Sequence, residues 1–385
     1  MLVYLIAGEP SGDMLGARLM RALKSQDSSI EFTGVCGDNM EKEGMHSLFD
    51  ISDLAVMGLV EVIPSIPKVL RHIRETVQDI KEKKPDIVIT IDSWSFSARV
   101  HKALRKQNIK VKQMHYVAPQ VWAWKKKRAK TMYKYIDRLL TLFPNEPKYF
   151  TPHNLPTDFV GHPVVESSMI NADSKDFISQ YSIPEDKKIA LILPGSRHNE
   201  VANLLPIFLD VVDELKKTNK DLYFVLPTVK TVENRVRNIL KQRNSDILVI
   251  NTQQERYSAA QSASFAIAAS GTVALELAII NVPHIIAYKA PALTAWLVRH
   301  ISNIKYVNLT NILLDKLIVP ELLQDECNKE NILKNVNLLL DKNSDLYKTQ
   351  EKGFDELRQN LGVGKVRPSQ KAADIIINEI KGISN

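Results

Sequence analysis

Short apolar segments alternate with segments of helical periodicity along the whole chain. In the first half, apolar runs of strand length occupy residues 2–7, 32–36, 87–91, 111–117 and 139–143. Amphipathic spacing typical of helices occupies residues 13–23, 97–106 and 126–135. Strands that alternate with helices predict βαβ units and a parallel sheet covered by helices on both faces.

The same alternation restarts after about residue 165. Apolar runs of strand length now occupy residues 189–193, 223–226, 247–250, 265–269 and 284–287, and helical spacing occupies residues 201–217, 231–241 and 272–280. The polar segment 173–187 suits a linker. We therefore expect an α/β fold with two Rossmann-like doubly wound domains facing a cleft. The expected boundaries are 1–168 and 169–345, with helices in 346–385 returning to the first domain.

The longest stretch that could suggest a membrane span is residues 263–288. It contains Gly271, Glu276 and Pro283, which favour a strand–turn–helix–strand unit over a spanning helix. The apolar run at the N-terminus has no basic flank and is too short for a signal peptide, so it predicts a buried first strand. We expect no transmembrane helix.

Composition narrows the class of protein only slightly. Of the 385 residues, 44% are hydrophobic and 25% are charged, which is ordinary for a globular chain and argues against disorder. The net charge of +7 favours anionic partners without choosing among nucleic acid, a membrane surface and a phosphorylated substrate. Cys36 and Cys327 lie far apart in the sequence, so neither a disulfide framework nor a zinc site is expected.

Two acidic turns in the first half are candidates for chemistry. Glu9 lies in GEPSGD at residues 8–13, directly after the first strand. Asp92 follows the strand 87–91, and a carboxylate at the carboxyl end of a strand can act as a general base on a substrate hydroxyl. The structural alternative is that both turns only start helices, with a capping side chain.

Two turns in the second half are candidates for binding phosphate. Residues 193–200 read LPGSRHNE, in which Gly195 permits a sharp turn and Arg197 offers a fork of donors to a diphosphate. Residues 269–276 read ASGTVALE, and the start of that helix could hold phosphate while Glu276 accepts bonds from ribose hydroxyls. The alternatives are a solvated surface arginine and a structural ion pair of Glu276.

Residues 56–74 combine apolar positions at helical spacing with interleaved basic residues. Such a stretch can lie in a membrane interface or bind acyl chains, or it can be an ordinary amphipathic helix that faces the core. Residues 122–130 read WAWKKKRAK, where aromatic and basic side chains could suggest RNA binding. Since no RRM, KH or zinc pattern accompanies this segment, we expect no nucleic acid as partner.

In this order, these segments resemble the lipid-A-disaccharide synthase family. The matching segments are 7–13 (AGEPSGD), 54–62 (LAVMGLVEV), 91–92, 115–124 (HYVAPQVWAW), 159–163 (FVGHP), 193–197 (LPGSR) with Glu200, 270–276 (SGTVALE), 306–313 (YVNLTNIL) and 321–324 (ELLQ). The likeness covers nearly the whole chain. One departure is at residues 92–97, where the family shows D-x-P-D-F-N and this chain reads DSWSFS.

The resemblance implies a glycosyltransferase B fold and a transfer reaction with inversion. UDP-2,3-diacylglucosamine would donate its sugar to 2,3-diacylglucosamine 1-phosphate (lipid X), and UDP would leave a β-1,6-linked disaccharide 1-phosphate. It implies no cofactor and no metal. It also implies a cytoplasmic protein attached peripherally to the cytoplasmic face of the inner membrane. The sequence leaves the oligomeric state open, with a homodimer as one candidate.

The resemblance also assigns roles to residues. Those carried over as catalytic are Asp92, as the base on the acceptor 6-hydroxyl, Glu9 and Arg197. The expected donor-binding residues are Arg197, Ser196, Glu200, Ser270, Gly271, Thr272, Glu276 and Asn311. The expected acceptor and membrane residues are Val62, Ile63, Ile66, Val69, Leu70 and Ile73.

Two other interpretations remain open from the sequence. One is a UDP-N-acetylglucosamine 2-epimerase, or another UDP-sugar enzyme of the same fold, which would not need the apolar segment 56–73. The other is a basic membrane- or RNA-binding protein without enzymatic activity, for which Asp92 would be indifferent.

Overall fold

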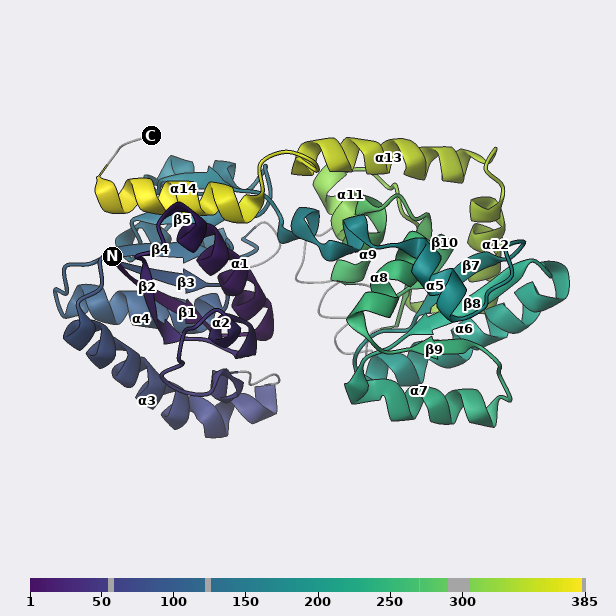
Figure 1. Ribbon diagram of the computed structural model, residues 1–385, viewed down its shortest axis with the longest axis horizontal. Helices are drawn as coiled ribbons and strands as arrows, with labels where there is room; N and C mark the ends of the chain where they lie inside the picture. The colour runs from purple at the N-terminus through teal and green to yellow at the C-terminus, as the bar shows by residue number, and fades with distance from the viewer. Residues whose placement is uncertain (55–58, 122–125, 270, 290–304, 383–385) are drawn as a thin grey trace. The chain divides into compact units, whose positions relative to one another are not determined.

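The computed structural model describes residues 1–54, 59–121, 126–269, 271–289 and 305–382, without the side chains of residues 59–65 and 126. The chain divides into two compact units, one formed by residues 1–163 with 364–385 and the other by residues 164–363. Each unit holds one six-stranded sheet whose paired strands are all parallel (Figure 1). The predicted doubly wound α/β fold is therefore confirmed.

The sheet of the first unit has the order β2-β1-β3-β4-β5-β6. Its strands are β1 (Leu2–Ala7), β2 (Glu31–Val35), β3 (Ile87–Ile91), β4 (Lys112–Tyr116), β5 (Arg138–Thr141) and β6 (Thr157–Phe159). Its helices are α1 (Pro10–Gln26), α2 (Asp38–Lys42), α3 (Leu59–Lys83), α4 (Trp94–Lys106) and α14 (Pro368–Lys381). The sequence missed β6, because three residues are too few to show a period.

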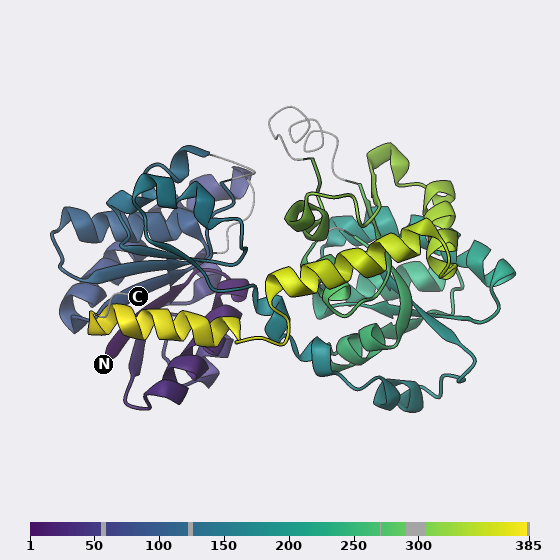
Figure 2. The same ribbon diagram turned by 90° about the horizontal axis from the view of Figure 1, so that it is seen from above.

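Apolar packing on both faces of this sheet explains why β1 and β3 are continuous apolar runs. On one face, α3 and α4 pack over a buried cluster that includes Tyr4, Val88 and Phe96. α1 contacts β1 and β3, and α14 packs against α1 (Figure 2). Glu379 of α14 accepts hydrogen bonds from Lys112 Nζ at 2.7 Å and from Arg138 Nε at 2.8 Å, which fastens the C-terminal helix to the first unit.

The sheet of the second unit has the order β12-β11-β10-β7-β8-β9. Its strands are β7 (Lys188–Leu193), β8 (Leu222–Pro227), β9 (Leu248–Ile250), β10 (Ala263–Ala268), β11 (His284–Tyr288) and β12 (Glu321–Leu323). Its helices are α5 (Ser174–Gln180), α6 (His198–Thr218), α7 (Lys230–Gln242), α8 (Gln253–Gln261), α9 (Thr272–Ile279), α11 (Leu309–Leu314), α12 (Lys329–Leu340) and α13 (Asp345–Leu361).

Three segments differ from the sequence expectations. The expected linker 173–187 contains α5, because Asp173 caps it and Phe177 anchors it in the core. The expected helix 126–135 consists of two short 3₁₀ turns, η2 (Lys126–Arg128) and η3 (Met132–Lys134). The chain returns to the first unit at residue 364 and not at 346, since α13 packs on α9, α11 and α12.

The segment 263–288 forms β10, α9 and β11, as its glycine, glutamate and proline predict. Within the described part of the chain, no helix has the length and apolar character needed to cross a membrane.

Candidate active site

The carboxyl ends of β1 and β3 bring Glu9 and Asp92 together. The two strands are neighbours, and Ala7 pairs with Ile91 in the parallel register. Ser93 joins the two acids, because its Oγ donates a hydrogen bond to Glu9 Oε1 at 2.7 Å and its backbone N–H donates one to Asp92 Oδ1 at 2.8 Å. Two of the predicted catalytic residues thus share one hydrogen-bonded turn at the edge of the sheet.

The turn after β3 has an unusual backbone. Asp92 has a φ of 58° and Ser93 a φ of 43°, so two successive residues with side chains adopt the left-handed conformation. Each such residue costs of order 1 kcal/mol. The Asp92 N–H donates to the Tyr116 carbonyl at 2.9 Å, and Ser97 Oγ donates to the Asp92 carbonyl at 2.9 Å. Strain that is held in place in this way clusters at functional sites.

The turn after β1 is packed closely on this strained turn. A Cβ atom at Gly8 would lie 2.8 Å from both Cβ and Oγ of Ser93, so only glycine fits there. Ser11 Oγ, in the first turn of α1, lies 3.4 Å from Asp92 Oδ2. Asp13 is buried and accepts hydrogen bonds from the backbone N–H groups of Gly37, Asn39 and Met40, so its role is to hold the start of α2.

In the second unit, residues 195–200 fold around a carboxylate. Ser196 N–H and Arg197 N–H donate to Glu200 Oε2 at 3.1 and 3.2 Å, and Arg197 Nη1 donates to Oε1 at 3.2 Å. Gly195 has a φ of 106°, and a Cβ there would lie 2.4 Å from Oε2. The Glu200 side chain is only 11% exposed while that of Arg197 is 68% exposed. Glu200 therefore holds the loop, and Arg197 extends into solvent.

The turn after β10 lies beside this loop. β10 and β7 are paired, and Ala269 N–H donates to the Leu193 carbonyl at 2.8 Å. Gly271 has a φ of 146° and is exposed, as is Thr272 at the start of α9. Glu276, one turn further along α9, is half-buried. Of the predicted donor-site residues, Ser270 lies outside the described residues.

Asn311 is engaged in the fold and not available to a ligand. It is fully buried, its Nδ2 donates to the Val319 carbonyl and to Glu321 Oε1, and its Oδ1 accepts from the N–H groups of Ile318 and Val319. These four bonds use the whole hydrogen-bonding capacity of the amide. The predicted nucleotide contact is thus corrected: Asn311 fixes residues 318–321.

The apolar segment on α3 presents only part of its predicted surface. Ile66 and Leu70 are 45% and 42% exposed. Val69 and Ile73 pack into the core cluster of the first unit, which corrects the expectation that they contact acyl chains or lipid. The side chains of Val62 and Ile63 lie outside the described residues.

Thr90 links two buried histidines, His101 and His115, and Gln113 contacts the first of them. Thr90 Oγ1 lies 2.8 Å from His101 Nε2 and 2.7 Å from His115 Nδ1, and His101 Nδ1 lies 2.8 Å from Gln113 Oε1. Burial lowers the pKa of His101 to about 4 and that of His115 well below its usual value. Both imidazoles are therefore neutral supports. Within the described ranges, no three His, Cys, Asp or Glu side chains are grouped as metal ligands.

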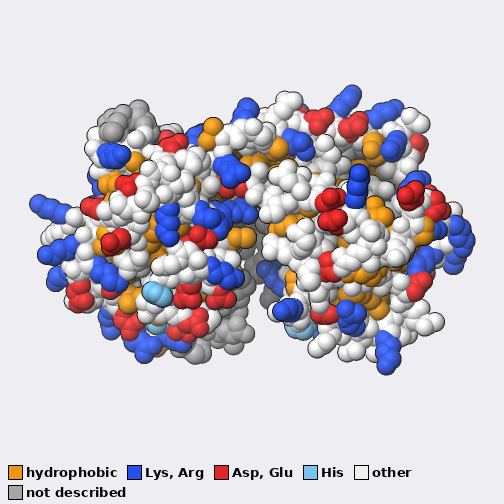
Figure 3. All heavy atoms as spheres, in the orientation of Figure 1, with side chains coloured by type: hydrophobic (Ala, Val, Ile, Leu, Met, Phe, Trp, Pro, Cys, Tyr) orange, Lys and Arg blue, Asp and Glu red, His pale blue; other side chains and the backbone are white. Residues whose placement is uncertain are grey.

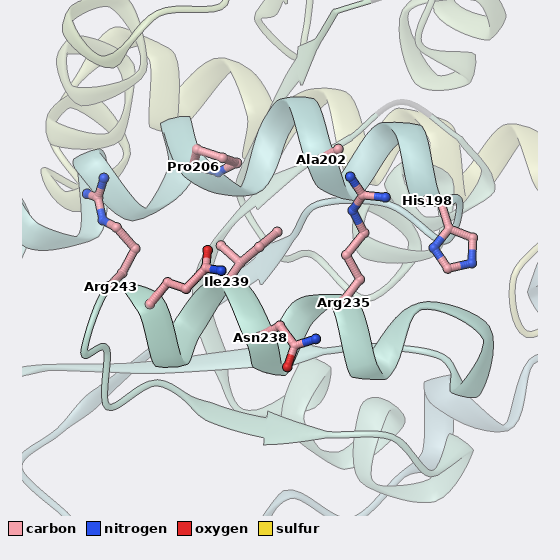
Figure 4. Close-up of a pocket in the computed structure, with 8 residues that line it drawn as sticks. His198, Ala202, Pro206, Arg235, Asn238, Ile239 and Arg243 are labelled. Atoms are coloured by element: carbon pink, nitrogen blue, oxygen red, sulfur yellow. The ribbon is translucent and has the colours of Figure 1, made fainter.

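A groove of about 580 Å³, lined by both polar and apolar side chains, lies between α6 and α7. Figure 4 shows His198 and Arg235 toward one end and Arg243 at the other. Arg243 forms ion pairs with Asp210 and Asp213, so the end that it occupies carries no excess of positive charge. The groove does not include the acidic turn of the first unit, and His198 alone adjoins the loop of Arg197.

The family model described as lipid-A-disaccharide synthetase matches residues 3–376. The chain belongs to the lipid-A-disaccharide synthase family. Relatives of that name include one from Paramagnetospirillum magneticum, 43% identical over 99% of this chain and 98% of the relative, and one from Rhodospirillum centenum, 41% identical over 99% and 95%. The prediction from the motifs, a glycosyltransferase of the lipid-A-disaccharide synthase family, is thereby confirmed.

Solved structures similar to this family member support its fold. A putative UDP-N-acetylglucosamine 2-epimerase from Listeria monocytogenes has a TM-score of 0.65 at 16% identity, covering 99% of this chain and 95% of its own. A UDP complex of MnaA from S. aureus has a TM-score of 0.63 at 16% identity, covering 100% and 97%. At such identities the likeness concerns the glycosyltransferase B architecture alone.

Sequence reasoning missed the functional placement of Ser93 and Glu321. Ser93 lies next to Asp92, but its bond to Glu9 joins residues 84 positions apart. Glu321 accepts from the backbone N–H groups of Val307 and Asn308 as well as from Asn311. Neither contact leaves a periodic signal. The pairing of β1 with β3 brings Ser93 to Glu9, and Glu321, the first residue of β12, is held against residues 307–311 by hydrogen bonds.

Proposed function

We propose that this synthase-family protein transfers 2,3-diacylglucosamine from its UDP derivative to lipid X. The products are the β-1,6-linked disaccharide 1-phosphate and UDP. The observation that carries the proposal is the strained acidic turn, in which Glu9 and Asp92 are joined through Ser93 at the carboxyl edge of a parallel sheet. Ligands of open α/β sheets bind at that edge.

The first unit supplies the base for the acceptor. Asp92 Oδ1 accepts a hydrogen bond from the Ser93 N–H, whereas the only neighbour assigned to Oδ2 within the described residues is Ser11 Oγ at 3.4 Å. Oδ2 takes the proton of the acceptor 6-hydroxyl as that oxygen attacks the donor anomeric carbon. The bond from this carbon to the phosphate oxygen breaks in the same displacement, so the configuration inverts and UDP carries away the electron pair.

The second unit supplies the positive charge that stabilises the leaving UDP. Arg197 has an exposed guanidinium on a loop that Glu200 holds, and the start of α9 at Gly271 and Thr272 follows the neighbouring strand. Guanidinium donors and the first turn of a helix both favour a diphosphate. The UDP named with the S. aureus structure, and the UDP-GlcNAc named with an epimerase from Neisseria meningitidis, support a UDP-sugar as donor.

The exposed apolar positions of α3 favour peripheral attachment to the cytoplasmic face of the inner membrane. Ile66 and Leu70 stand exposed on a helix that also carries Arg71 and Arg74. Apolar side chains beside cations bind anionic lipid surfaces and acyl chains. The buried His72, whose ring nitrogens lie 2.8 Å from Glu75 Oε2 and 3.1 Å from Asp53 Oδ2, ties this helix to the segment before it.

The two alternatives have less support. The epimerases share the fold, but the family relationship and the exposed Ile66 and Leu70 favour an acylated substrate. For an RNA-binding protein, a basic stripe would be expected. On the face in Figure 3, Lys and Arg side chains are interspersed with Asp and Glu.

An assay of the purified protein with defined substrates tests the proposal. We expect UDP release and disaccharide formation only when UDP-2,3-diacylglucosamine and lipid X are both present. UDP-N-acetylglucosamine alone serves as the control for epimerisation. Formation of a 2-epimer, or no UDP release with the acylated pair in the presence of anionic vesicles, would contradict the proposal.

A further inference from the structure

Ser93 occupies the N-cap position of α4 without capping the helix. Serine is favoured at that position because its hydroxyl accepts a bond from a backbone N–H of the first turn. In α4 no such bond forms, and the Ser93 hydroxyl donates to Glu9 Oε1 instead. Ser93 therefore lacks the capping bond that would stabilise α4, and its hydroxyl instead bonds Glu9, which follows β1.

The surroundings of Ser93 enforce this arrangement. Its φ of 43° follows the φ of 58° at Asp92, and the missing Cβ of Gly8 leaves the room in which its side chain lies. Its N–H donates to Asp92 Oδ1. A single residue therefore binds one oxygen of each acid, one through its side chain and the other through its backbone.

We propose that Ser93 is the positioning residue of the transfer reaction. It fixes Glu9 through Oε1 and Asp92 through Oδ1, so that each acid keeps its second oxygen for the acceptor sugar. Asp92 Oδ2 takes the proton of the attacking hydroxyl. Glu9 Oε2 accepts a hydrogen bond from a second hydroxyl of the acceptor sugar, since the hydrogen bond from Ser93 uses Oε1. This inference rests on the proposed function and adds a residue to it.

The first test compares Ser93→Ala with Ser95→Ala in the disaccharide assay. Ser95 is exposed in the first turn of the same helix and bonds neither acid through its side chain, so it is the matched control. A lost hydrogen bond to a charged group corresponds to roughly a tenfold to hundredfold effect. We expect Ser93→Ala to lower kcat by that factor, with the KM for the UDP-sugar within about twofold of wild type. Unchanged kcat in Ser93→Ala would overturn the inference.

A double-mutant cycle tests whether Ser93 acts through Glu9. We expect Glu9→Ala alone to lower turnover, and Ser93→Ala to add less than about threefold in the Glu9→Ala background, because the hydrogen bond between the two side chains is already lost there. Fully additive losses would overturn the inference. A residue that merely supports the fold would not produce this coupling.

Thermal unfolding separates a positioning role from a folding role, and also from failure of the proposed function. Ser93→Gly keeps the N–H and relieves the left-handed strain, so we expect its Tm to equal or exceed that of wild type while its turnover falls. A Tm several degrees lower would overturn the inference. If wild type forms no disaccharide, the proposed function fails, and the Tm of Ser93→Gly still decides whether strain is held at Ser93.

Discussion

The turn after β3 in the first unit and the turn after β7 in the second both require a left-handed backbone, but they place different residues there. The first unit uses Asp92 and Ser93 at φ of 58° and 43°, while the second uses Gly195 at 106°. In the first turn the strained residue itself carries the side chain proposed as the base, so glycine cannot replace it. In the second the proposed diphosphate ligand, Arg197, comes two residues later, so glycine can make the turn without strain.

The same contrast extends to the carboxylates. Asp92 accepts a hydrogen bond of 2.8 Å at Oδ1 and only a long one of 3.4 Å, from Ser11 Oγ, at Oδ2, so Oδ2 is the oxygen better placed to react. Both carboxylate oxygens of Glu200 accept hydrogen bonds from its own loop, and its side chain is 11% exposed. An acid held at one oxygen can still accept a proton from substrate, whereas an acid enclosed by backbone N–H groups fixes the shape of a loop. The two turns therefore contrast a carboxylate that we propose reacts with substrate, Asp92, with one that holds a loop, Glu200.

The largest expected effect comes from neutralising the acid of the first turn. Asn tolerates the left-handed conformation as well as Asp, so Asp92→Asn should keep the Tm of wild type. Loss of the general base should lower kcat by roughly 10²–10⁴-fold. UDP release measured with both acylated substrates, beside the Tm, checks this. Asp176→Asn, an exposed acid in the first turn of α5, is the control, and turnover near normal in Asp92→Asn would remove Asp92 from its role.

The next effect comes from the exposed guanidinium of the second turn. Arg197→Ala should weaken UDP binding roughly tenfold to hundredfold, since the bonds to the diphosphate are charge-assisted, and should leave stability unchanged. Isothermal titration with UDP measures the affinity. Arg235→Ala removes an equally exposed cation from α7 and should change nothing. Equal losses in the two variants would mean that only the general charge of the second unit matters.

A smaller effect should follow from a methyl group in the second turn. Gly195→Ala meets both a φ of 106° and the Glu200 carboxylate at 2.4 Å, whereas Gly364→Ala meets a φ of 78° with nothing within 4 Å. Both variants bear backbone strain of at least about 1 kcal/mol, and the strain is larger at a φ of 106°. The excess loss of unfolding free energy in Gly195→Ala, about 1–2 kcal/mol or more, therefore combines this strain with the steric contact. Chemical denaturation of the two variants gives this difference, and its absence would show that the loop shifts to accept the methyl group.

Most of the fold could be predicted from the sequence, because apolar runs of strand length must be buried and therefore mark the strands of the two sheets. β1 and β3 are buried on both faces, and the strand ends pointed to Asp92 and to the loop of Arg197. α5 escaped prediction because its seven residues are mostly polar and a single Phe177 anchors it. β12 was missed because its three residues show no period.

The site was less predictable than the fold, for a physical reason. A motif states which residue type occurs at a position, but not the direction in which its side chain points. Asn311 was predicted to contact the nucleotide, but its side chain forms its hydrogen bonds with residues 318–321. Ile73 was predicted to contact lipid, but it packs into the core. Conversely, the bond of Ser93 to Glu9 depends on a left-handed turn that no side-chain pattern encodes.

Acid should destabilise the two units unequally. The first unit contains three histidines that burial keeps neutral, His101, His115 and His162, and the second contains one, His284. Burial lowers the pKa of His101, His162 and His284 to about 4 and that of His115 well below its usual value. The unfolded chain binds these protons first, so the stabilising contribution is complete above pH 6.5 and declines as the pH falls toward 4.

At pH 5.5 each buried histidine should cost about 1.4 kcal/mol relative to pH 7.5, so the first unit, with two more of them, should lose about 3 kcal/mol more than the second. Hydrogen exchange of peptides from β3 and β4 against peptides from β10 and β11, corrected for intrinsic rates, measures the difference. The carboxyls of Glu255 and Glu379 have lowered pKa values and titrate below this window, so they do not obscure it. Equal loss of protection in the two units would show that the additional buried histidines of the first unit do not resist protonation.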